Sequence, residues 1–113
     1  MTDHCSTKTA RIRELNDQLR CKAIGGRIVI TRGIEALGDE GVAKVLAAVA
    51  RFDSFTEDND PWGEHDCAVL NEDGRRIMFK IDYFDRGLRW HSPDASNPAV
   101  TVRVLTVMLA EQY

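Results

Sequence analysis

An Asp-Gly turn after a short apolar run constrains the fold most, because it predicts a β-hairpin. Residues 67–70 (CAVL) are apolar, and Asp73-Gly74 can supply the positive φ angle that a tight reversal requires. The return run has apolar side chains at alternate positions: Ile77, Phe79, Ile81 and Tyr83. Residues 85–87 turn the chain again, and Leu88 and Trp90 then alternate with Arg89 and His91. We expect a three-stranded antiparallel meander.

Two helices and one further strand are predicted before this meander. From Thr9, apolar residues recur at helical spacing until Gly25-Gly26, which can end a helix. We expect the charged residues of this helix to form a solvated face: Arg11, Arg13, Glu14 and Asp17. Residues 27–31 (RIVIT) are β-branched and predict a strand buried on at least one face. Asp39-Glu40 suit the start of a second helix, which has five apolar residues at steps of three and four: Val42, Val45, Leu46, Val49 and Phe52.

The last segment carries two patterns. Val100, Val102 and Val104 alternate as in a strand, whereas Leu105, Met108 and Leu109 fit a helix. Asn97-Pro98 is a typical helix start, and the segment 98–112 is long for a strand. These features favour a helix.

The predicted element order is therefore α-β-α-β-β-β-α. We expect a small two-layer α+β domain in which three helices pack on an antiparallel sheet of about four strands. A polar N-terminus at residues 1–8 is expected to be flexible, and residues 9–113 to form a single domain. We expect the buried core to include residues of the second helix, the sheet and the last segment: Leu46, Val49, Phe79, Ile81 and Leu105.

Composition limits the classes of function. The 113 residues carry a net charge of −3, which argues against a general nucleic-acid binder with clustered Lys and Arg. No run of about 18 apolar residues predicts a membrane span, and no secretory signal is visible. Three cysteines without paired spacing suit reduced thiols, so we expect a cytoplasmic protein.

The stretch of residues 52–66 (FDSFTEDNDPWGEHD) is the main candidate for a functional site. It is long for a connection, and long loops in compact domains usually carry function or structure of their own. Its polar residues can cap turns while Phe55 and Trp62 hold the loop to the core. Alternatively, it can present acidic groups and an aromatic anchor to a partner through Asp58, Asp60, Trp62 and Glu64.

A third interpretation of this stretch is a divalent-metal site. Carboxylates and one imidazole lie together at Glu64, His65 and Asp66 and could supply ligands, but the sequence offers no second strong ligand motif. The neighbouring Cys67 could share a face with His65 and be activated as a thiolate, although a buried thiol is the favoured interpretation.

Three runs resemble a small proteobacterial family classed only as a domain of unknown function. They are NDPWGEHD (59–66), KIDYFD (80–85) and VLTVMLAEQY (104–113), and the resemblance extends from about Ala10 onward. The sequence departs from the family pattern at Cys67, where an aromatic is expected, and at Gly38, where proline is expected. Because the family has no assigned activity, the resemblance implies no catalytic residues. It implies a mobile-element context.

Two functions follow as hypotheses. The first is a non-enzymatic protein-binding module without a cofactor, which engages a larger protein or protein–nucleic-acid complex through a basic surface. In a mobile element such a module could inhibit a host defence complex, in the manner of an anti-CRISPR or anti-restriction protein. The second is a small metal-dependent hydrolase or nuclease centred on Glu64, His65 and Asp66. The shortage of general acid–base pairs favours the first.

Overall fold

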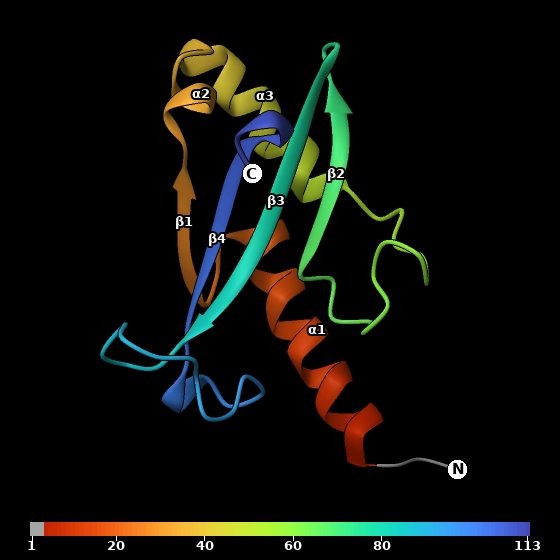
Figure 1. Cartoon of the computed structure of the whole chain (residues 1–113), viewed down its shortest axis with the longest axis vertical. Helices are drawn as coiled ribbons and strands as arrows, with labels where there is room; N and C mark the ends of the chain where they lie inside the picture. The colour runs from red at the N-terminus through yellow and green to blue at the C-terminus, as the bar shows by residue number, and fades with distance from the viewer. Residues whose placement is uncertain (1–3) are drawn as a thin grey trace.

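Four strands form one mixed sheet in the computed structural model, which describes the backbone of residues 4–113 and the side chains from Thr7 onward. The strands are β1 (Gly26–Ile30), β2 (Cys67–Glu72), β3 (Arg75–Phe84) and β4 (Val102–Leu109), and their order in the sheet is β1-β4-β3-β2 (Figure 1). β3 is antiparallel to both of its neighbours, β2 and β4, whereas β1 runs parallel to β4. The α+β prediction is confirmed, although the sheet is mixed rather than antiparallel.

The β2–β3 hairpin forms as predicted. Asp73 and Gly74 have φ angles of 54° and 78°, the left-handed pair that a two-residue turn uses. The predicted inward positions of β3 are buried at Ile77, Phe79 and Ile81, while Tyr83 is half-buried. Local turn chemistry and side-chain alternation thus determine this part of the sheet.

The prediction of a helix over 98–112 is wrong. Asn97 does cap a turn, since its side chain accepts a hydrogen bond from the Ala99 N–H, but this 3-10 turn, η1, spans only Pro98–Val100. β4 then follows, and its alternate residues Arg103, Leu105 and Val107 are buried. β4 pairs with β1 on one side and β3 on the other, so the backbone hydrogen bonds of a central strand outweigh the helix-start signal.

The prediction of a third strand in the meander, at residues 88–91, is also wrong. The chain at 85–91 is a turn with one isolated bridge, between Phe84 and His91. Asp85 holds this turn, because its side chain accepts from the Arg89 and Trp90 N–H groups. Leu88 and Trp90 are consequently exposed, and β4 lies beside β3 in their place.

Helices cover one face of the sheet (Figure 1). They are α1 (His4–Lys22), α3 (Gly38–Arg51) and the short α2 (Arg32–Glu35). α1 begins at His4 rather than at the expected Thr9, so residues 4–8 of the N-terminus that was expected to be flexible belong to the helix. Residues 1–3 lie outside the described residues. No helix in the described part of the chain is both long and apolar enough to cross a membrane.

The core lies between these helices and the sheet. Of the five residues expected there, Val49, Phe79, Ile81 and Leu105 are buried and Leu46 is partly buried against them. Leu19 from α1 and Ile34 from α2 belong to the same cluster. The strand predicted at 27–31 is present as β1, but it is an exposed edge strand rather than a buried one.

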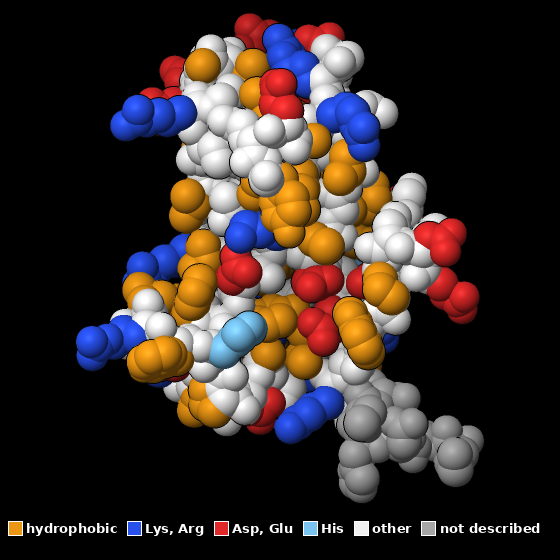
Figure 2. Space-filling model, in the orientation of Figure 1, with side chains coloured by type: hydrophobic (Ala, Val, Ile, Leu, Met, Phe, Trp, Pro, Cys, Tyr) orange, Lys and Arg blue, Asp and Glu red, His pale blue; other side chains and the backbone are white. Residues whose placement is uncertain are grey.

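The opposite face of the sheet is open. Val69, Met78 and Val104 alternate with the buried residues of their strands and so point away from the helices. Figure 2 shows hydrophobic side chains along the middle of the face toward the viewer, with acidic and basic groups among them. The domain therefore has two layers, one of helices and one of strands.

Candidate functional site: the acidic loop and the polar network beneath it

The segment of residues 52–66, which we call the acidic loop, connects α3 to β2. Its first part is held by aromatic contacts, because the rings of Phe52 and Phe55 meet edge to face at 4.9 Å and both pack edge-on against Phe79. Phe55 thus anchors the loop as predicted. Trp62 does not, since it is 77% exposed.

A capped turn follows these anchors. The Asn59 side chain accepts from the Thr56 N–H at 2.7 Å and donates to the Ser54 carbonyl at 3.0 Å. The Asp60 N–H donates to the Thr56 carbonyl at 2.8 Å. These bonds confirm a turn-capping role for Asn59 and leave Asp58 exposed at its surface.

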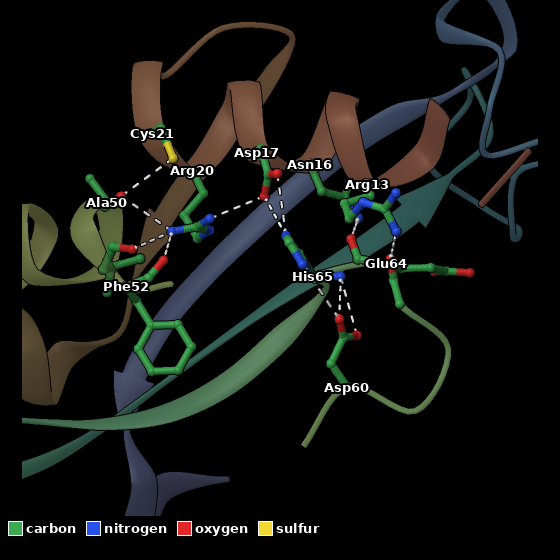
Figure 3. A network of polar contacts seen from close by, with 12 residues as sticks. Arg13, Asn16, Asp17, Arg20, Cys21, Ala50, Phe52, Asp60, Glu64 and His65 are labelled. Carbon is green, nitrogen blue, oxygen red and sulfur yellow. Dashed lines mark hydrogen bonds and ion pairs between the residues drawn. The ribbon is translucent and has the colours of Figure 1, made fainter. Parts of the chain in front are cut away.

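Asp60 is the buried carboxylate of the loop, with its side chain only 3% exposed. Both of its oxygens accept from the His65 N–H at 3.2 Å, and His65 Nε2 lies 3.8 Å from Asp60 Oδ2 (Figure 3). His65 has a φ of 56°, an unusual conformation for a residue other than glycine. The Asp60 carboxylate therefore holds a tight reversal of the backbone.

The His65 imidazole is fixed on its other side by α1. Its Nδ1 lies 2.9 Å from Asp17 Oδ1, and the ring stacks on Phe55 with centroids 3.9 Å apart (Figure 3). His65 thus bridges a carboxylate of the loop and a carboxylate of α1. The contact ties the end of the loop to the helix.

Glu64 is also committed to internal contacts. Its side chain accepts from the Tyr83 hydroxyl at 2.8 Å, and its carbonyl accepts from the Asn16 amide at 3.0 Å. Burial and the nearby Glu64 carboxylate raise the pKa of Tyr83, so its hydroxyl remains a hydrogen-bond donor. Asn16 in turn accepts from Arg103 Nε at 2.8 Å.

Buried arginines lie beneath the loop, and the sequence interpretation missed them. Arg20 donates to the carbonyls of Val49, Ala50 and Phe52 at the end of α3, and to Asp17 at 3.0 Å (Figure 3). Arg103 is buried under α1, where its guanidinium lies 5.2 Å from the centre of the Tyr83 ring. Burial lowers the pKa of Arg103.

The prediction of a solvated charged face on α1 is therefore wrong in part. Arg11 and Glu14 do form an exposed pair, but Arg13 donates to the Gly63 carbonyl at 3.0 Å and Asp17 contacts His65. Residue spacing in α1 could have indicated which polar side chains are buried. Asn16 and a buried arginine, Arg20, follow the apolar Ile12 at steps of four and so share its face.

The four predicted partner-binding residues divide into two pairs. Asp58 and Trp62 are exposed, whereas Asp60 is buried and Glu64 is half-buried against Tyr83. A groove of about 690 Å³ runs between the loop and α1 and is lined by residues of both, among them Thr9, Arg13, Glu57, Trp62 and His65. The exposed part of the site is thus Trp62 with the acidic groups beside this groove.

The three candidate metal ligands do not converge. Glu64 faces Tyr83, and His65 faces Asp17. Asp66 is a separate, partly buried carboxylate, whose pKa is raised by burial and by repulsion from nearby acidic groups. In the part of the chain that the structure describes, no three His, Cys, Asp or Glu side chains gather to hold a metal ion.

Cys67 lacks the environment of an activated thiol. Burial and the neighbouring Asp66 and Asp60 raise its pKa, which opposes formation of the thiolate. In β2, Cys67 pairs with Lys80, on the face of the sheet opposite the buried Phe79. The interpretation as an inert, partly buried cysteine is the better one.

The chain matches one known protein family over most of its length. Residues 30–112 match the sequence model of a family described as protein of unknown function (DUF3768). The chain belongs to the DUF3768 family. The match confirms the resemblance to a domain of unknown function, but it begins at Ile30 rather than near Ala10, so α1 and most of β1 lie outside it. No curated protein and no solved structure matches the chain.

Proposed function

We propose that this DUF3768 member is a non-enzymatic protein-binding module, and that the acidic loop is its binding surface. The supporting observation is Trp62, which is 77% exposed on a loop whose base is fixed by Phe55, Asp60 and His65. Large aromatic side chains dominate binding energy at interfaces, and a loop already held in place loses little entropy on binding.

The partner we propose is a larger protein or protein–nucleic-acid complex with a basic surface. Asp53, Glu57 and Asp58 are exposed acidic residues of the same loop. They would speed and orient the encounter, while Trp62 would supply most of the affinity. Asp60 and Glu64 act from inside, by holding the loop, because their carboxylates already bind His65 and Tyr83.

The proposal also includes a biological setting. The sequence resemblance implies a proteobacterial mobile element, in which an acidic cytoplasmic module without a cofactor would inhibit a host defence complex of the CRISPR or restriction type. The alternative, a metal-dependent hydrolase at Glu64, His65 and Asp66, has less support because these side chains face different partners.

The Trp62→Ala variant tests this proposal, with Trp90→Ala as a matched control. Both tryptophans are exposed, at 77% and 74%, but Trp90 lies in the 85–91 turn outside the acidic loop. With the protein as bait in a host lysate, we expect Trp62→Ala to lose the partner that the wild type captures and to keep its melting temperature. Trp90→Ala should capture normally.

The salt dependence of partner capture distinguishes the contribution of the acidic groups from that of Trp62. Asp58→Asn should weaken capture mainly at low ionic strength, because exposed charges are screened as salt rises. A folded Trp62→Ala protein that captures the partner as well as the wild type does would contradict the proposal.

A further inference from the structure

In the part of the chain that the structure describes, no strand pairs with the outer edge of β1. β1 pairs with β4 on one side, and in Figure 1 no labelled element lies along its other side. The Thr31 N–H donates to the Val107 carbonyl at 3.1 Å, so Thr31 faces β4. Because alternate residues of a strand face the same neighbour, the backbone groups of Gly26, Ile28 and Ile30 point outward.

This edge is apolar and lacks the usual protection. Ile28 and Val29 are 39% and 45% exposed, and Ile24 just before the strand is 55% exposed. Edge strands are normally shielded by proline, bulges or several charges, but β1 carries a single charged residue, Arg27. The other edge strand, β2, ends with Asn71 and Glu72.

We propose that a second copy of the chain pairs with this edge, β1 against β1 and antiparallel, with the two-fold axis at Ile28. A symmetric dimer uses the same patch on both copies, and two identical strands can meet in this way only if they run antiparallel. The four-stranded sheets would join into one sheet of eight strands. This surface is separate from the acidic loop, and the inference does not depend on the proposed function.

The position of the axis follows from the outward backbone groups. If the axis lies at Ile28, all three outward residues have partners. Ile28 pairs with Ile28 of the other copy, and Gly26 of each copy pairs with Ile30 of the other. A centre at Val29 would place Gly26 opposite Arg32, which lies in α2. A centre at Arg27 would place two guanidinium groups opposite each other, which is unfavourable.

The side chains of β1 are self-complementary in this register. Arg27 lies opposite Val29 of the other copy, so no like charges face each other directly, and the two exposed Ile28 side chains meet at the axis. This complementarity favours a second copy over a foreign strand. A strand of five residues makes a short interface, so the dimer should be reversible and depend on protein concentration.

A charge-pair experiment tests the proposal. Sedimentation equilibrium of the wild type should show a mass that rises from one chain to two with concentration. Ile28→Lys and Ile28→Glu should each remain monomeric, because each places like charges at the axis, and an equimolar mixture of the two should dimerise again. Val69→Lys, at an exposed apolar position of β2, is the control and should dimerise as the wild type does.

A disulfide experiment tests the register. With Cys5 and Cys21 replaced by serine, Ile28→Cys should form an intermolecular disulfide under mild oxidation, whereas Val29→Cys should not, because its partner is Arg27. Circular dichroism checks that each variant is folded. A wild type that stays monomeric at every concentration, that pairs only with a foreign strand, or whose dimer ignores charge at position 28 would overturn the proposal.

Discussion

At the scale of single residues, the burial of Asp60 separates it from the acidic groups around it. We expect Asp60→Ala to lower the free energy of unfolding by about 1–3 kcal/mol, because the His65 N–H would lose its acceptor. Asp58→Ala is the matched control and should change stability by less than about 0.5 kcal/mol. Urea denaturation of the two variants measures the difference, and equal losses would show that burial is not the reason.

Asp66 should make stability depend on pH. Burial, then repulsion from Glu64, Asp60 and Asp82, raises its pKa in the folded state above the ordinary value of 3.8. The folded state then binds the proton more tightly than the unfolded state, so this contribution to stability is present at low pH and is lost as pH rises through the folded pKa. We expect Asp66→Asn to be more stable than the wild type at pH 7, with the gain disappearing towards pH 3 in urea titrations.

At the scale of elements, Arg20 joins α1 to the end of α3. Its guanidinium donates to the carbonyls of Val49, Ala50 and Phe52, where α3 ends and backbone carbonyls begin to run out of intrahelical donors; the Val49 carbonyl also accepts from the Phe52 N–H. We expect Arg20→Ala to cost at least about 2 kcal/mol of unfolding free energy, because these bonds are charged and mostly buried. Arg11→Ala removes only an exposed pair and should cost about 0.5 kcal/mol or less. Thermal denaturation of both variants makes the comparison.

Some elements could be predicted from the sequence because local rules determine them. The hairpin follows from Asp73-Gly74 and the alternation in β3, and α3 follows from its apolar spacing. β4 could not, because its local signals favoured a helix and only pairing with β1 and β3 makes it a strand. The strand expected at 88–91 failed for a different reason, because the Asp85 side chain holds a local turn there.

The candidate site shows the same division. The sequence indicated the loop at residues 52–66 and its anchor Phe55, but it did not show that Trp62 is exposed. It could not show that Asp60 turns inward while Asp58 stays exposed, because that depends on the backbone reversal at His65. Nor could it show that α1 supplies Asn16 and Arg20 to the polar network, since Asn16 lies 48 residues from Glu64 and Arg20 lies 29 residues from Val49.

At the scale of the whole molecule, α1 is part of the fold although it lies outside the family match at 30–112. Leu19 is fully buried in the core, and the buried Asn16 and Arg20 contact β4 and α3. A chain without α1 would expose this apolar surface and leave Arg103 without the Asn16 acceptor. The matched region therefore needs the preceding helix to complete its core.

This dependence predicts the effect of shortening the chain. A chain beginning at Gly26 should fail to show a cooperative urea transition, because removal of Leu19 alone from a packed core costs about 2–5 kcal/mol and a domain of this size has only about 5–15 kcal/mol in total. A chain beginning at Thr9 is the control and should unfold cooperatively, since it keeps every buried residue of α1 from Leu15 onward. Circular dichroism at increasing urea distinguishes the two. Cooperative unfolding of the chain that begins at Gly26 would show instead that residues 26–113 fold without α1.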